Sequence, residues 1–168
     1  MTAPVLALDA FLTSLSVADI EAMRKAAPQH LLDQFDAATA DVDKLVRFVG
    51  RGLDSTAAEL AFRQIPEWVR LSVADTLLRF HRGTHDTCMH NPSPSRPEPI
   101  VAAAWRPGLV TCVQCVHLFK MVGDPDRTCD HCGHVCAGIH SCTLSCGALI
   151  FSYGLCSGCL ADHKAVGR

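Results

Sequence analysis

Cys112-Val113-Gln114-Cys115 and, further along the chain, Cys129-Asp130-His131-Cys132-Gly133 are the stretches that decide how the second half of this sequence can fold. Each Cys-x-x-Cys pair can offer two thiolates to one metal ion from a single tight turn. Zinc takes four such ligands in a tetrahedron, so the two pairs together predict one closed zinc site. Its expected ligands are Cys112, Cys115, Cys129 and Cys132.

The distribution of cysteine supports metal binding rather than disulfide formation. All 10 cysteines follow residue 87, and 49% of the 168 residues are apolar, so we expect a folded chain with a separate cysteine-rich part. The start of the chain has no signal-peptide pattern, and no apolar run reaches membrane-spanning length. A cytoplasmic location is therefore expected, where clustered cysteines are more often metal ligands than disulfides.

The first half of the sequence has helical periodicity, and we predict a helical domain over residues 1–83. Pro4 suits a first helical turn, and Ser16 with Asp19 resembles a capping box. Thr56 with Glu59 suggests another box, which would open a short helix running to residue 64. Apolar residues at alternating spacings of three and four predict an amphipathic helix after Pro28, and a further helix begins near Pro66. In the helix after Pro28, the apolar residues at these spacings are Phe35, Ala38, Val42, Leu45 and Val49.

The second half changes character, and we predict a β domain over residues 100–168. Residues 84–99 contain several prolines and cannot continue a helix, so they form a connection with possible metal ligands. The predicted strands cover residues 100–105, 109–111, 116–122 and 148–153. The fold class expected from the whole chain is α+β, with a helical bundle followed by a small antiparallel zinc-binding β domain.

Residues Val110 to Gly133 resemble the zinc-ribbon family, in which a β-hairpin carries one cysteine pair at each end. Gly133 matches the glycine that usually follows a ribbon knuckle, whereas Val116 occupies the equivalent place after the first pair. The resemblance implies a zinc-stabilised hairpin with strand 116–122 and a turn at residues 123–126. It implies little about function, because zinc ribbons serve many purposes.

A second metal site is predicted from the pair Cys156 and Cys159, which supplies only half of a ligand set. Cys88 and His90 lie in an irregular segment and are the first choice to complete it. The two sites would then be nested, and the chain would bind two zinc ions. Thiolate sets also accept iron, so the sequence leaves the metal identity open.

Two other arrangements of the second site are compatible with the same residues. In one, the pairs alternate, and Cys88 and His90 join Cys129 and Cys132. In the other, residues from the segment 136–146 complete the set. The candidates there are Cys136, His140, Cys142 and Cys146, which we otherwise expect to be loop residues and small buried thiols.

Catalysis is not favoured by these patterns. A set of four cysteines closes the zinc coordination sphere, whereas catalytic zinc keeps an open position. His85, His90 and Asn91 beside cysteine pairs loosely resemble zinc-stapled nucleases, but the further Asn and His of such enzymes are not visible. A nuclease or other hydrolase is therefore the least favoured of the functions considered.

The sequence instead favours a non-enzymatic zinc-binding adaptor or regulatory protein with a macromolecular partner, protein first and nucleic acid second. A net charge of −2 gives no general attraction to a phosphate backbone. Residues 56–74 loosely resemble a helix-turn-helix but carry few base or phosphate readers. The predicted hairpin offers candidate nucleic-acid contacts in Arg106, Lys120 and Arg127. It also offers a possible apolar protein-binding patch of Trp105, Phe119, Met121 and Val122.

Overall fold

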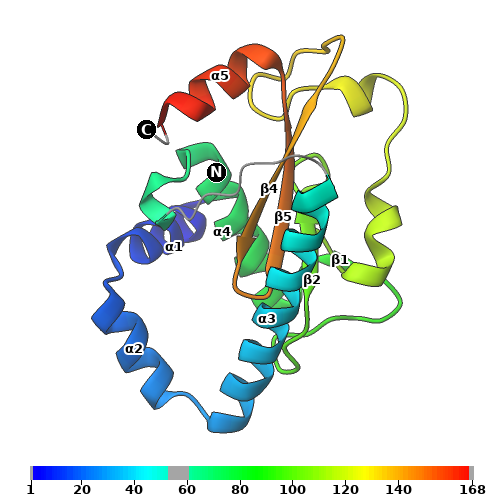
Figure 1. Cartoon of the computed structure of the whole chain (residues 1–168). Coiled ribbons are helices and arrows are strands. Elements are labelled where there is room, and N and C mark those ends of the chain that lie inside the picture. Colours follow the sequence, from blue (N-terminus) through cyan, green and yellow to red (C-terminus); the bar gives the residue numbers. More distant parts are fainter. Residues whose placement is uncertain (1, 53–60, 167–168) are drawn as a thin grey trace.

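The computed structural model describes residues 2–52 and 61–166 and confirms the α+β class (Figure 1). Its sheet is mixed rather than antiparallel, with strand order β1-β3-β2-β5-β4. The α-helices are α1 Ala3–Ser14, α2 Val17–Ala26, α3 Gln29–Gly52, α4 Glu67–Arg82 and α5 Ser157–Val166. The strands are β1 Asp86–Thr87, β2 Ile100–Ala103, β3 Leu109–Cys112, β4 His140–Cys146 and β5 Leu149–Leu155. Short 3₁₀ helices are η1 Phe62–Gln64, η2 Val113–Phe119 and η3 Asp124–Arg127.

Local signals in the first half correctly predict where several helices begin. Pro4 lies in the first turn of α1, and the hydroxyl of Ser16 accepts a hydrogen bond from the N–H of Asp19 to form the predicted capping box of α2. The predicted box of Thr56 and Glu59 lies outside the described residues. Helix α4 begins directly after Pro66, as expected.

The helices in the described ranges do not form a separate bundle, although α1 and α4 share a small core of Val5, Leu71 and Ala74. Helix α4 packs on the sheet, where Val69 and Val73 share the main hydrophobic core with Phe151 and Leu155 of β5. Helix α1 packs on the other side of α4, and α3 lies against the β4–β5 hairpin. One core therefore crosses the boundary that the sequence suggested near residue 84, because the apolar stripe of α4 matches the apolar face of the sheet.

The sheet is built around β2, which pairs antiparallel with β3 and parallel with β5. Strands β4 and β5 form an antiparallel hairpin, whose turn contains Gly147 at a φ of 57°. The segment 136–146, expected to be a loop, therefore contains a seven-residue strand. The signal for this strand was the alternation of Cys142, Leu144 and Cys146 with Ser and Thr, but the cysteines were interpreted as thiols of a loop.

The predicted strand over residues 116–122 is wrong, and no zinc ribbon is present in the described segment Val110 to Gly133. This region instead contains η2 and η3. Phe119 at the end of η2 is buried against Val101 and Ala103, and its carbonyl accepts a hydrogen bond from the indole N–H of Trp105. The turns of η2 bury Phe119, whereas the predicted solvent-exposed hairpin would leave this side chain accessible to water. Of the predicted apolar patch, Phe119 is buried, Trp105 and Met121 are half-buried, and Val122 is 77% exposed.

No single helix in the described ranges is long and apolar enough to cross a membrane. Helices α1 and α2 pass that test only as a pair, by length and composition, and they are bent by 106° at the break between them.

Candidate metal centres

The first cluster of potential metal ligands, called cluster 1 here, consists of Cys88, His90, Cys112 and Cys115. Strand β1 ends just before Cys88, and β3 ends at Cys112. Because β1 and β3 run parallel, with Thr87 opposite Val110, their carboxyl ends meet at one edge of the sheet. Helix η2 then turns the chain so that Cys115 joins the same group. The four ligand atoms all lie within 4.8 Å of one another.

The geometry of cluster 1 suits a tetrahedral ion. The Sγ atoms of Cys88 and Cys112 are 3.8 Å apart, and His90 Nδ1 lies 3.4 Å from Cys112 Sγ and 3.3 Å from Cys115 Sγ. The three cysteines are buried, whereas His90 is exposed. Asn91 follows with a positive φ of 46°, and its N–H donates to the carbonyl of Cys88, which closes the turn that presents this half of the set.

The second cluster, called cluster 2, consists of Cys129, Cys132, Cys156 and Cys159, whose sulfur atoms also lie within 4.8 Å of one another. The first two cysteines belong to a tight turn that contains Gly133 at a φ of 74°. In this turn the N–H of Gly133 donates to the carbonyl of Cys129 over 2.8 Å. The turn places both sulfur atoms on one side, as a metal-binding knuckle requires.

The other half of cluster 2 lies at the start of α5, which sequence analysis missed. Cys156 immediately precedes this helix, and Cys159 lies in its first turn. The N–H of Cys156 donates to Cys129 Sγ over 3.4 Å, and Cys132 Sγ lies 4.0 Å from Cys156 Sγ. A helix N-terminus carries partial positive charge and favours thiolate nearby. The segment Leu160 to Val166, without Gly or Pro, was the available signal for this helix.

Electrostatics in both clusters favour a bound cation. Burial opposes ionisation of Cys88, but N–H donors of Cys112 and His90 outweigh it and lower the pKa of that thiol to about 6. Burial, reinforced by the neighbouring Cys112 and Cys88, raises the pKa of Cys115 to about 11. The thiolate of Cys88 therefore opposes ionisation of Cys115, and a bound cation would compensate the charge of both.

Cluster 2 shows the same division among its thiols. Burial opposes ionisation of Cys129, but N–H donors of Cys132, Cys156 and His131 lower its pKa to about 6. The hydrogen bond with Cys156, together with burial, raises the pKa of Cys159. The donor atoms and their spacing thus fit a thiophilic divalent ion in both clusters.

The structure contains all eight predicted ligands in its two clusters but divides them differently from the prediction. Cys112 and Cys115 lie with Cys88 and His90, and the predicted set of four cysteines does not form. The nested and alternating arrangements are therefore both wrong. The reason is topological, since the hairpin expected to join the two central pairs is absent. Parallel pairing of β1 with β3 assembles cluster 1, and the β4–β5 hairpin returns the chain to cluster 2.

The remaining candidates for a ligand set lie outside the two clusters. Cys142 stands opposite Tyr153 in the β4–β5 hairpin, and His140 Nε2 lies 3.1 Å from Ser157 Oγ. Burial, followed by the charges of Cys156, Cys132 and Cys129, raises the pKa of Cys136. His131 stacks on Trp68 with ring centroids 5.3 Å apart, so it links the knuckle to α4.

Comparisons with known proteins do not extend this description. No family model matches the chain, and neither a curated protein nor a solved structure shows significant similarity to it.

Proposed function

We propose that this protein is a non-enzymatic adaptor, in which two structural zinc ions hold the β part in shape and a neighbouring groove binds a segment of another protein. The observation that carries the structural role is the completeness of both clusters. Each offers four nitrogen or sulfur ligands within 4.8 Å, so a zinc ion in either cluster would have no open coordination position for a substrate or a reactive water. A reducing compartment keeps cysteine thiols available as zinc ligands, so the proposed location is the cytoplasm.

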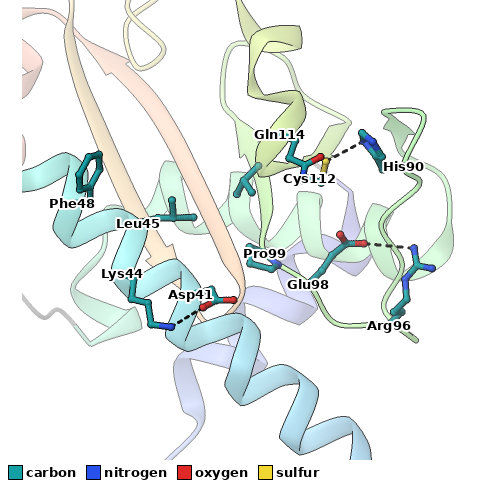
Figure 2. Close-up of a pocket in the computed structure, with 11 residues that line it drawn as sticks. Asp41, Lys44, Leu45, Phe48, His90, Arg96, Glu98, Pro99, Cys112 and Gln114 are labelled. Carbon is teal, nitrogen blue, oxygen red and sulfur yellow. Dashed lines mark hydrogen bonds and ion pairs between the residues drawn. The ribbon is translucent and has the colours of Figure 1, made fainter.

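The groove lies between α3 and cluster 1 and has a volume of about 860 Å³ (Figure 2). Leu45 and Phe48 project from α3 on one side, and Pro99 lies across from them. Val113 also lines the groove. Phe48 is 79% exposed and Leu45 is 37% exposed among the described residues, so together they give the groove an accessible apolar wall. Cys112 and His90 line the same groove, so metal binding in cluster 1 would shape one of its walls.

The charges around the groove favour a protein segment over a phosphate backbone. The ammonium group of Lys44 lies 2.9 Å from the carboxylate of Asp41, and Arg96 lies 3.7 Å from Glu98. Each cation is therefore partly neutralised by a carboxylate on the same wall, which leaves little attraction for a polyanion. Apolar walls with paired charges at the rim are typical of protein interfaces.

The metal part of the proposal is tested by native mass spectrometry of protein made without added metal. Two zinc ions per chain are expected, and mild chelation should remove secondary structure as well as metal. A single zinc ion, or retention of the full near-UV circular dichroism signal without metal, would contradict two structural sites.

The groove is tested by selecting peptides from a random display library on the zinc-loaded protein. We expect apolar-rich peptides that bind wild type and the control variant Val122→Asp but lose binding to Phe48→Asp. Both substitutions place a carboxylate at a highly exposed apolar position, so they differ mainly in location. Peptides that ignore Phe48→Asp, or tight duplex-DNA binding that weakens steeply with salt, would overturn the groove assignment.

A further inference from the structure

The wall of the groove opposite α3 is built from cluster 1 and the chain that follows it. His90 and Cys112 are ligands of the cluster, and both line the groove (Figure 2). Val113 and Gln114 lie between the two cysteines of its Cys-x-x-Cys pair. The other lining residues on this side belong to the range 96–99, which follows His90 and leads to β2. Among the described residues, this wall therefore depends on chain segments that meet at cluster 1.

Residues 89–98 are attached to the rest of the described chain mainly by cluster 1. Within the described ranges, the hydrogen bonds and ion pairs that join them to other segments all end on Cys88, Cys112 or Cys115. These hydrogen bonds come from the ring and the N–H of His90 and from the N–H of Asn91. Of residues 89–98 only Pro92 is buried, so packing adds little to the attachment.

The α3 side of the groove is held in place without cluster 1. Ala38 and Val42 of this helix are 4% and 0% exposed, and the ring of Phe35 lies against Gly147 in the turn of the β4–β5 hairpin. Both ends of the range 89–98 are also fixed, because β1 pairs with β3 before it and β2 pairs with β3 and β5 after it. Loss of metal from cluster 1 would therefore loosen one wall of the groove and leave the rest of the fold in place.

We propose that metal binding in cluster 1 controls the groove. A bound ion fixes residues 89–98 and the Cys112 turn as one wall, whereas loss of the ion releases this wall while α3 and the sheet stay in place. Among the described residues, none of cluster 2 lines the groove, so its ion has no such role. For the partner that fills the groove, the proposal rests on the function proposed above. Partner and metal then bind cooperatively, and by linkage each raises the affinity for the other by the same factor.

NMR relaxation of the full chain tests the release of the wall without any partner. Zinc is buffered at a level at which native mass spectrometry finds two ions on wild type and one on His90→Ala. Backbone order parameters of the non-proline residues in the range 89–98 should be about 0.85 in wild type and below about 0.6 in this variant. Those of residues 129–133 in cluster 2 should not change. His90→Cys keeps a thiophilic ligand, so it should retain two ions and the wild-type order parameters.

A peptide that is selected on the zinc-loaded protein, and that Phe48→Asp no longer binds, tests the cooperativity. At the same zinc level, its dissociation constant should rise about tenfold or more for His90→Ala and stay near the wild-type value for His90→Cys. Both variants remove the imidazole that lines the groove, so the comparison separates the metal from a direct contact with the ring. Saturating peptide should also raise the zinc affinity of cluster 1 in wild type, by the factor by which zinc raises the peptide affinity.

The variants at position 90 also define the results that contradict metal control. Equal zinc affinities of wild type and His90→Ala, an ordered range 89–98 in the one-ion variant, or equal peptide affinities with one and two ions would overturn the proposal. Weak peptide binding by His90→Cys with two ions would overturn it too, because the ring rather than the metal would then make the contact. A wild-type chain that binds no groove peptide would contradict the adaptor function, and the order parameters would still decide whether the ion holds the wall.

Discussion

Clusters 1 and 2 offer nearly the same ligand chemistry but are connected to the rest of the molecule in different ways. Cys129 of cluster 2 is fully buried in the main hydrophobic core, in the same group as Val69 of α4 and Phe151 of β5. Cluster 1 instead has a small core of its own, in which its three cysteines pack with Leu118. Two metal sites with similar ligands can therefore differ in how much of the fold is destabilised when the metal is lost.

Aromatic contacts strengthen the connection of cluster 2 to the core. His131 of the knuckle stacks on Trp68 of α4, and Trp68 in turn meets Tyr153 edge to face. The hydroxyl of Tyr153 lies 2.9 Å from His163 Nε2, which links β5 to α5. We therefore expect cluster 2 to be coupled to global stability and cluster 1 mainly to the edge of the sheet and the groove.

The largest effect is expected from Cys129→Ser. This change should remove one metal ion and lower the free energy of unfolding by more than about 4 kcal/mol, because it empties a metal site and places a hydroxyl in the core. Metal analysis together with near-UV and far-UV circular dichroism measures this. Since α4 shares the core, its helical signal should weaken too, and an intact helical signal would show that the helices are stable without the sheet.

Cys115→Ser is the matched change in cluster 1. It should also remove one metal ion, but the free energy of unfolding should fall by only about 2–3 kcal/mol, since the main core does not include this residue. Urea unfolding followed by the combined fluorescence of Trp68 and Trp105 compares the two variants directly. Equal destabilisation by Cys115→Ser and Cys129→Ser would remove the distinction drawn between the clusters.

Gly154→Ala tests how tightly cluster 2 is packed against the sheet. A Cβ at this position would lie 2.6 Å from Ile139 Cγ2, and the Gly154 N–H donates to Asp130 of the knuckle. The overpacking should cost about 1–3 kcal/mol in thermal or urea unfolding. Gly158→Ala is the control, because an added Cβ there meets nothing within 4 Å and should be neutral or slightly stabilising in α5. A larger loss of unfolding free energy for Gly158→Ala than for Gly154→Ala would contradict this description of the packing.

The smallest effect is expected from His90→Cys. The exposed position retains a thiophilic ligand, so the chain should still bind two metal ions, with a change in unfolding free energy below about 1 kcal/mol. Cobalt substitution provides the readout, since a fourth thiolate should intensify the sulfur-to-cobalt charge-transfer absorption of cluster 1. An unchanged cobalt spectrum would show that position 90 does not bind the metal, and His90→Ala provides the comparison without a ligand.

The ligands themselves were predictable from sequence, whereas their partition was not. Cys-x-x-Cys spacing and the irregular segment around His90 identified eight side chains that the structure gathers into two clusters. Any four of them satisfy zinc equally well, so spacing alone could not decide which pairs combine. The choice rested on a hairpin expected at residues 116–128, where burial of Phe119 produces a helical turn instead.

What the sequence by itself determined is local: the capped starts of helices, the strands around β2, the mixed α and β content and the metal-binding residue types. These depend on near neighbours along the chain, where propensity, capping and ligand spacing act. What only the tertiary structure decided is long-range: the packing of α4 on the sheet, the parallel pairing of β1 with β3, and the composition of each cluster. Those features depend on which apolar faces match in three dimensions, and burial of such faces has no fixed separation in sequence.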